Sequence, residues 1–290
     1  MQKINYYASV PLDRAFEQRR DSQWLEDRLQ APESRLVPVY RSLNYVTRDS
    51  EEPRAVMIPA AEPWWRGRGK VEIALLGVAN DIAVFAGDFS EIDHPDKVPQ
   101  LVERGAFADL RMIGALLPHN ESGLLAYARG LMSWHRRHRH CGVCGHATKN
   151  ADGGHMRVCN SERCRATFAP RSDPGVVILL QDPERCMLAR SPKLPAGVYA
   201  PLSGMPEPGE SLEDAVIRIV AEETGAKAKE IHYHSSQPWP FPNALMVGFY
   251  VQVQSSGLRI NPNRLEDARW FDREWLLSVS DLGWFRLPRP

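Results

Sequence analysis

Short apolar runs alternate with turn residues between residues 55 and 89, where the chain reads AVMIPA and then VEIALLGVANDIAVFAGDF. Glycines and the pair Asn80-Asp81 separate these runs at a spacing typical of strands joined by tight turns. Residues 1 to about 50 are charged and show little periodicity, so we expect them to be irregular. The pattern predicts a small β-rich domain at the N-terminus.

Between residues 101 and 138 the apolar spacing becomes helical, and Pro118 interrupts it. This predicts two helices, the second ending near Trp134. Strand-like runs return from residue 175 as GVVILLQ, RCMLAR and ALMVGFYVQV, with one helix from about Leu212 to Thr224 among them. Strands that flank an isolated helix favour an α+β fold or an α/β sandwich.

The predicted helix 212–224 has capping signals at both ends, because Ser211 and Asp214 form a capping box and Gly225 suits the position that ends a helix. At about 100° per residue, one face carries Ala215, Ile219, Glu222 and Glu223. A second stripe suited to pack on a sheet consists of Leu212, Val216 and Val220.

The adjacent carboxylates of Glu222 and Glu223 repel each other unless a cation lies between them. Mg²⁺ and Mn²⁺ are hard ions that prefer oxygen ligands and also bind phosphate. A solvated helix end explains the same two residues equally well. The helix alone therefore leaves a metal site and a solvated end open.

The composition narrows the class of protein. With 290 residues, 43% hydrophobic and 25% charged, the chain has material for about two packed domains and a small third. Lys plus Arg and Asp plus Glu are 36 each, so charge indicates no nucleic-acid or membrane partner. No apolar run reaches the roughly 18 residues of a membrane span, and the N-terminus has no signal-peptide pattern. We expect a cytoplasmic protein without a membrane partner.

Four of the five cysteines form two pairs, with two residues inside the first pair and four inside the second. Four thiolates close a tetrahedral Zn²⁺ site, and the ion then stabilises a segment of about 25 residues that is too short for its own core. Four unrelated buried cysteines are the alternative, and a nearby His140, His146 or His155 is a possible substitute ligand. The spacing predicts structural Zn²⁺ at Cys141, Cys144, Cys159 and Cys164.

The stretch from Gly204 to Ala226 resembles the Nudix box, G-x5-E-x7-R-E-U-x-E-E-x-G-U, in which U is apolar. The residues that match in register are Gly204, Glu210, Arg218, Val220, Glu222, Glu223 and Gly225. Downstream, SQPWPFPNALM resembles the SQPWPFPxS signature of NADH pyrophosphatases within the Nudix superfamily. The cysteine cluster, PRSDP after it and ARGLMSWHRRHRHC before it resemble the same group, so the similarity spans about residues 101–290.

The resemblance implies an α+β chain of three parts. These are an N-terminal β-rich Nudix-like domain at residues 1–135, a zinc ribbon at 136–170 and a C-terminal Nudix α/β/α sandwich at 171–290. It also implies a homodimer with its active site near the subunit interface. Enzymes of this group cleave the diphosphate of NADH or NAD⁺ to nicotinamide mononucleotide and AMP, and some remove NAD caps from RNA.

The resemblance also implies roles for single residues. Glu222 and Glu223 would bind Mg²⁺ or Mn²⁺, and Arg218 would orient Glu210. Glu266, preferred here to Asp267, would be a further acidic ligand. Trp239 and Phe241 suit either packing or base recognition, and Gln237 suits a polar contact. Met205 and Phe168 lie at or beside the places where two aromatic residues are expected to enclose the nicotinamide ring.

The sequence departs from the family pattern at four positions. Ile219 replaces a box glutamate and can neither bind metal nor accept a proton, and Glu207 or Glu210 would be the carboxylates able to compensate. Met205 and Ala169 replace the two expected aromatics, and Ala244 replaces the serine that ends the signature. The chain also ends at FRLPRP, where relatives continue into another helix. Three functions stay open: slow NAD(H) hydrolysis, nucleotide binding without catalysis as a sensor or regulator, and hydrolysis of a substrate without nicotinamide.

Overall fold

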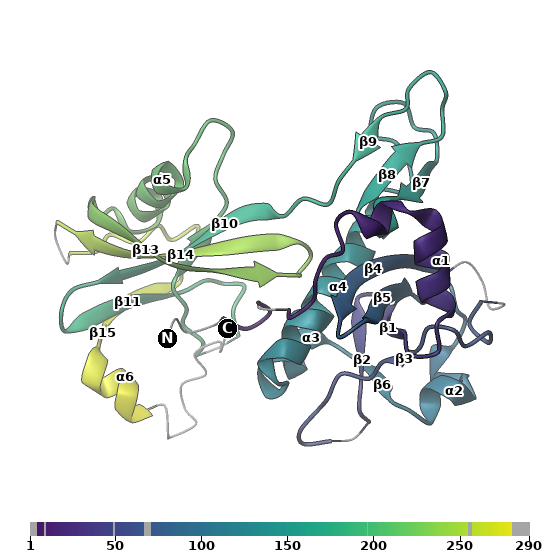
Figure 1. Ribbon diagram of the computed structural model, residues 1–290. Coiled ribbons are helices and arrows are strands. Elements are labelled where there is room, and N and C mark those ends of the chain that lie inside the picture. The colour runs from purple at the N-terminus through teal and green to yellow at the C-terminus, as the bar shows by residue number, and fades with distance from the viewer. Residues whose placement is uncertain are drawn as a thin grey trace. The chain divides into compact units, whose positions relative to one another are not determined.

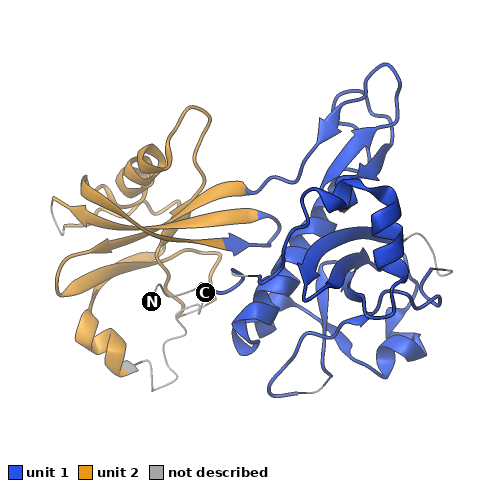
Figure 2. Cartoon of the chain, viewed as in Figure 1, with its two compact units in different colours: residues 1–172, 238–243 blue, residues 173–237, 244–290 orange. Residues whose placement is uncertain are grey.

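The computed structural model describes residues 5–279 except 9, 49, 67–70, 196, 255 and 256, so the C-terminal FRLPRP lies outside the described residues. The chain divides into two compact units (Figure 2). The first comprises residues 1–172 with 238–243, and the second comprises residues 173–237 with 244–290. No described helix combines the length and the apolar character that a membrane span requires.

The first unit is built on a six-stranded sheet in the order β4-β5-β1-β2-β6, with β3 paired to β1. The strands are β1 Arg35–Tyr40, β2 Leu43–Val46, β3 Ile58–Pro59, β4 Glu72–Ala79, β5 Ile82–Asp88 and β6 Ala106–Ala108. The helices are α1 Ser22–Gln30, α2 Pro99–Val102, α3 Leu110–Ile113 and α4 His119–Arg137. Helix α4 packs against β1, β4 and β5 (Figure 1). Its Leu125, Ala128 and Met132 side chains are fully buried.

The expectation that residues 1 to about 50 are irregular was wrong, because α1, β1 and β2 lie there. Helix α1 has nine residues, and its apolar side chains Trp24, Leu25 and Leu29 are only partly buried against the core of the first unit, so its periodicity is too short to stand out. Its start is instead fixed by Asp21, whose side chain accepts hydrogen bonds from the amides of Gln23 and Trp24. Strand β1 buries four consecutive residues and therefore shows no alternation. The break at Pro118 is confirmed, but α4 continues three residues past Trp134.

The cysteine-containing segment belongs to the first unit and forms a three-stranded antiparallel sheet. Its strands are β7 Thr148–Ala151, β8 Met156–Cys159 and β9 Thr167–Phe168. Side chains join this segment to strand β4 and helix α4: His155 Nε2 lies 2.8 Å from the Leu75 carbonyl oxygen, and Arg157 Nη1 lies 2.8 Å from His135 Nδ1. The predicted boundary after residue 135 stays a prediction.

The second unit is built on a sheet in the order β13-β14-β10-β11-β15, with β12 paired to β10. The strands are β10 Asp173–Gln181, β11 Arg185–Arg190, β12 Leu202–Gly204, β13 Ala228–Trp239, β14 Ala244–Val253 and β15 Asp267–Asp272. The helices are α5 Leu212–Thr224 and α6 Arg273–Val279. Figure 1 shows α5 over one face of this sheet, and its apolar side chains share a core with Val176, Ile178 and Leu202.

Helix α5 has the predicted bounds, and its capping box and left-handed Gly225 are confirmed, with φ of 66° at the glycine. The division of its surface into two faces was wrong. Ile219 is buried in the same core as Val216 and Val220, and Ala215 is buried as well, because positions separated by three or four residues merge into one wide stripe. Glu223 ends this buried stripe, whereas the Glu222 side chain is 49% exposed.

Candidate functional site

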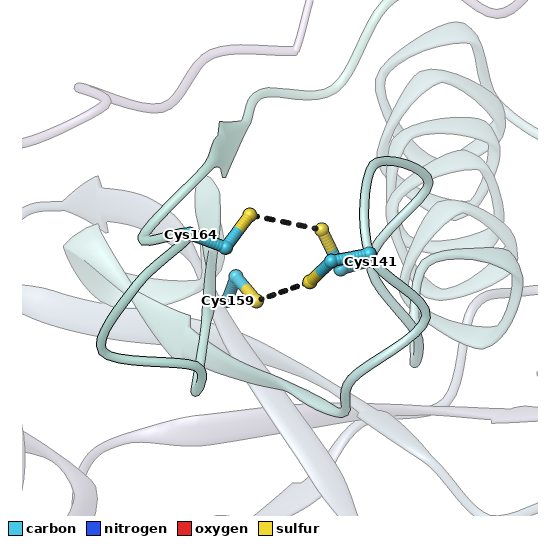
Figure 3. A group of neighbouring side chains, drawn as sticks. Cys141, Cys159 and Cys164 are labelled. Carbon is cyan, nitrogen blue, oxygen red and sulfur yellow. Dashed lines mark hydrogen bonds between the residues drawn. The ribbon is translucent and has the colours of Figure 1, made fainter.

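The four clustered cysteines present their sulfur atoms to one another (Figure 3), and all four sulfurs lie within 4.8 Å. The Sγ atoms of Cys141 and Cys164 are 3.8 Å apart, and those of Cys144 and Cys159 are 3.4 Å apart. Four sulfurs at about 2.3 Å from one Zn²⁺ are separated by roughly 3.8 Å along a tetrahedron edge. The residues therefore fit a closed structural zinc site, as the spacing predicted.

Backbone geometry supports thiolates at this site. The amides of Val143 and Ser161 each donate to a cysteine sulfur two residues earlier, at 3.4 Å in both cases. No histidine joins the cluster among the described residues, since the only group of three or more metal-ligating side chains found there is the four cysteines. His155 instead contacts Leu75 and Tyr127.

In the second unit, Arg218 joins α5 to the loop that precedes it. Its Nε and Nη2 donate to Glu210 Oε1 and Oε2 at 2.6 Å and 2.8 Å, and Nη2 also donates to the Met205 carbonyl oxygen at 3.1 Å. Hydrogen bonds from Arg218, and then from the Glu207 amide, lower the pKa of Glu210 to about 2. The same guanidinium lies 3.4 Å from Glu222 through Nη1. Glu210 is therefore ionised and is held by Arg218 in a bidentate pair.

Glu223, the neighbour of Glu222, lies in a different environment. Its side chain is 8% exposed, and its Oε1 lies 3.3 Å from Arg264 Nη2 and 3.4 Å from Arg264 Nε. Burial raises the pKa of the Glu223 carboxyl, and the nearby Arg264 charge opposes that rise. One carboxylate thus faces solvent and the other is buried beside an arginine.

A cavity of about 620 Å³ lies against Glu223 in the second unit. Among the described residues that line it, Glu223 is the one carboxylate, and Lys193 and Arg264 carry the positive charges. The remaining polar lining comes from Ser191, Ser203 and Asn263. Sequence reasoning missed these five residues, because four lie in loops outside the box, Ser203 lies in β12 directly before it, and none follows a periodic pattern. Their combination of hydroxyl, amide and cationic groups suits a phosphate-bearing ligand.

The two candidates for a further acidic ligand both have partners. Glu266 Oε2 lies 2.6 Å from Arg190 Nη2. Asp267 accepts a hydrogen bond from Tyr199, and its Oδ2 lies 2.5 Å from Arg269 Nε. Neither is among the described residues that line the cavity. A role for Glu266 as a ligand therefore stays a prediction.

The signature residues fall in both units. Trp239 and Phe241 belong to the first unit, where both rings meet Tyr7 edge-on, at 6.0 Å and 5.8 Å between centroids. Arg129 lies 4.6 Å from the Phe241 centroid, and its Nε donates to Pro240 at 2.9 Å. These contacts are packing contacts.

Gln237, in the second unit, is buried, and its Nε2 has no hydrogen-bond partner. An unsatisfied buried amide of this kind is a donor suited to a ligand.

The two positions expected to enclose a nicotinamide ring differ in their surroundings. Met205, in the second unit, has 49% of its surface exposed. Phe168, in the first unit, is half-buried against the N-terminal core, 6.3 Å from His138 between ring centroids. Ala169 beside it is exposed. Their pairing around one ring stays a prediction.

Ile219 has 1% of its surface exposed. A Cβ atom placed on Gly204 would lie 2.5 Å from Ile219 Cδ1, so β12 approaches α5 closely at this point and Gly204 leaves the required space. The isoleucine is a core residue that joins β12 to α5.

Comparison with known proteins places this geometry in a family. The NUDIX domain matches residues 171–287, the NADH pyrophosphatase-like rudimentary NUDIX domain matches residues 33–134, and the NADH pyrophosphatase zinc ribbon domain matches residues 136–168. The NAD-capped RNA hydrolase NUDT12 of Pongo abelii is 30% identical over 317 residues, which cover 96% of this chain and 68% of that protein. The chain belongs to the zinc-ribbon NADH pyrophosphatase group of the Nudix family.

Other members of this group match the chain over shorter stretches. The NAD-capped RNA hydrolase NUDT12 of Macaca fascicularis is 42% identical over 175 residues, which cover 58% of this chain and 38% of that protein. The NAD-capped RNA hydrolase NudC of Pseudomonas syringae pv. syringae is 40% identical over 148 residues, covering 51% of this chain and 52% of that protein. The matched region thus spans about half or less of the length of these two Nudix relatives.

The Nudix fold implies a divalent cation at the box, and the chemistry of the donors tests that implication. Glu222 and Glu223 supply hard carboxylate oxygens from adjacent helical positions, which suits a hard cation. Ile219 supplies no ligand, because its side chain lies in the core. The donor set therefore offers a cation two box carboxylates rather than three, one exposed beside Arg218 and one buried beside Arg264.

Proposed function

We propose that the chain hydrolyses the diphosphate of NAD(H) or a related dinucleotide to NMN(H) and AMP, with Mg²⁺ or Mn²⁺ as the cation. The cavity of about 620 Å³ beside Glu223 carries this proposal, because it brings one buried carboxylate together with Lys193 and Arg264. Membership of the NADH pyrophosphatase group supports it independently. Because the two NUDT12 relatives and the NudC relative are named as NAD-capped RNA hydrolases, NAD-capped RNA is a second candidate substrate.

Different side chains at the site would bind the phosphates and the cation. Lys193 and Arg264 bind and orient the negatively charged phosphates, and the hydroxyls of Ser191 and Ser203 donate hydrogen bonds to their oxygens. Glu222 and Glu223 would hold the cation, which would supply positive charge against the phosphoryl oxygens and favour ionisation of the attacking water.

The proton of the attacking water needs an acceptor within the cavity. Glu223 is the one carboxylate in the described lining, and we assign it this role. Water oxygen bonds to one phosphorus, the bridging P–O bond breaks, and the leaving phosphate carries away the bridging oxygen. Each product then ends in a monophosphate.

Other signature residues support the site from outside the cavity. Arg218 acts on Glu210 as a positioning residue, since their bidentate pair fixes the loop before α5 against the helix. Gln237 offers its unpaired amide to the substrate. We further propose that Met205 contacts the nicotinamide and that Glu266 assists cation binding. The chain would act as a cytoplasmic homodimer with residues 171–290 as its catalytic domain.

Release of AMP tests the proposal. The purified protein is incubated with NADH, NAD⁺, ADP-ribose or a short NAD-capped RNA, with Mg²⁺ or Mn²⁺, and the products are separated by chromatography. We expect AMP from NAD(H), and for the capped RNA a 5′-monophosphate end. Glu223→Gln should lower kcat by about 100-fold or more, because it removes the base and a ligand. Glu213→Gln, on the exposed first turn of the same helix, is the matched control.

Two outcomes contradict the proposal. Absence of product from every substrate with either ion would favour a nucleotide-binding protein without catalysis. Equal turnover by the natural chain and by Glu223→Gln would place the chemistry elsewhere.

A further inference from the structure

The buried carboxylate of Glu223 already has a cationic partner within the chain. Both nearby nitrogens of Arg264 contact the same oxygen, Oε1, at 3.3 Å and 3.4 Å. The Arg264 side chain is 53% exposed, whereas that of Glu223 is 8% exposed. The guanidinium therefore approaches Glu223 from the open side, from which a ligand in the cavity also reaches it.

The segment 259–265 is held at the C-terminal end of α5 by the backbone. The amide of Arg259 donates to the Thr224 carbonyl oxygen at 2.8 Å, and the amide of Asn261 donates to the Glu223 carbonyl oxygen at 2.9 Å. Leu265, directly after Arg264, is buried in the core of the second unit. Arg264 is thus placed by the fold, and a cation at the end of a helix also interacts favourably with its dipole.

A divalent ion and a guanidinium compete for the same oxygen. Glu223 and Arg264 line the same cavity, and Arg264 lies on the open side of the largely buried Glu223 carboxylate, so a divalent ion that enters the cavity meets the guanidinium at that carboxylate. Glu222, the other box carboxylate, is exposed and lies 3.4 Å from Arg218, so it provides a weak anchor by itself.

From this arrangement we infer that Arg264 is an internal competitor for the cation at Glu223, which binds only as the guanidinium moves away. The inference rests on the proposed cation site. It adds to that proposal a residue that sets how much free Mg²⁺ or Mn²⁺ the chain needs. A chain that lacks a third box carboxylate and holds an arginine on the second binds its cation weakly.

Mn²⁺ binding tests the inference without reference to turnover. The zinc-loaded protein is titrated with Mn²⁺ alone, and free Mn²⁺ is followed by its electron paramagnetic resonance signal. Arg264→Gln should tighten binding by about ten-fold, the equivalent of one hydrogen-bonded ion pair. Arg264→Lys keeps the positive charge but loses the planar guanidinium, so its Mn²⁺ affinity should lie between those of the natural chain and Arg264→Gln. Arg259→Gln is the matched control, because Arg259 is exposed, lies in the same segment and lines no part of the described cavity.

A second comparison tests whether the effect of Arg264→Gln on Mn²⁺ binding requires Glu223, which distinguishes competition from a general effect of charge. In the Glu223→Gln background, Arg264→Gln should no longer tighten binding. The inference is overturned if Arg264→Gln binds Mn²⁺ no more tightly than the Arg259→Gln control, or if neither the natural chain nor Arg264→Gln binds it. Circular dichroism on each variant shows that the fold is retained. If AMP release fails but Arg264→Gln still tightens Mn²⁺ binding, the proposed reaction falls and the competition stands.

Discussion

At the scale of single residues, Ile219 packs in the core at a position where the Nudix pattern has a glutamate. It is fully buried between α5 and β12, so a carboxylate there would lie among apolar groups. We expect Ile219→Glu to lower the free energy of unfolding by roughly 2–4 kcal/mol, because an unpaired carboxyl replaces a packed side chain. Thermal unfolding followed by circular dichroism measures this.

Ile217→Glu on the same helix is the control, since Ile217 is 49% exposed and should tolerate the change. If Ile219→Glu unfolds at the same temperature as Ile217→Glu, the side chain at 219 can turn out of the core. The contact between Ile219 and Gly204 would then be no obstacle to rebuilding a three-carboxylate site.

At the scale of elements, α5 carries the box residues and its N-terminal cap fixes their register. Ser211 Oγ accepts from the Asp214 amide at 3.0 Å, and the Asp214 carboxylate accepts from the Ser211 amide at 3.0 Å. Ser211→Ala should cost about 1 kcal/mol of stability in the second unit, measured by urea unfolding. Ser211→Asn keeps an acceptor and should cost much less, so equal losses in both variants would contradict a capping role.

The same element shows what the sequence can and cannot predict. Helix α5, β11 and β14 have their predicted bounds, because caps and continuous apolar runs mark them locally. Strand β13 was missed, because it lies at the sheet edge and exposes residues such as His232 and Tyr233.

The candidate site likewise contains some contacts that the sequence predicts and others that it does not. The Arg218–Glu210 pairing lies within a local motif, and the contact itself appears in the structure. Arg264 was missed because it reaches Glu223 across 41 positions, through backbone bonds that no sequence pattern records. The four-cysteine cluster was predicted correctly despite its distance in sequence, since knuckle spacing is itself a local signal.

At the scale of the whole molecule, a buried polar network joins the zinc ribbon to helix α4 in the first unit. His135 Nε2 donates to the Gly154 carbonyl oxygen at 2.8 Å, while its Nδ1 accepts from Arg157 at 2.8 Å. Both contacts are satisfied only by the neutral imidazole, since Arg157 always donates. The charged and titratable groups that face this ring are Glu72, Arg157 and His155.

Protonation of His135 should therefore weaken the first unit. Burial lowers the pKa of this imidazole from 6.5 to about 4, so the unfolded chain takes up the proton first as the pH falls. The stabilisation by the neutral imidazole is complete above pH 6.5. Roughly 3 kcal/mol of it should be lost as the pH drops towards 4. The unfolding temperature of the zinc-loaded protein, measured at intervals across this range, gives the slope. His135→Gln should flatten the slope, whereas His94→Asn, an exposed control, should not. If His135→Gln leaves the slope of unfolding temperature against pH unchanged, other groups cause the acid sensitivity. His155 is the first candidate, because burial lowers its pKa as well.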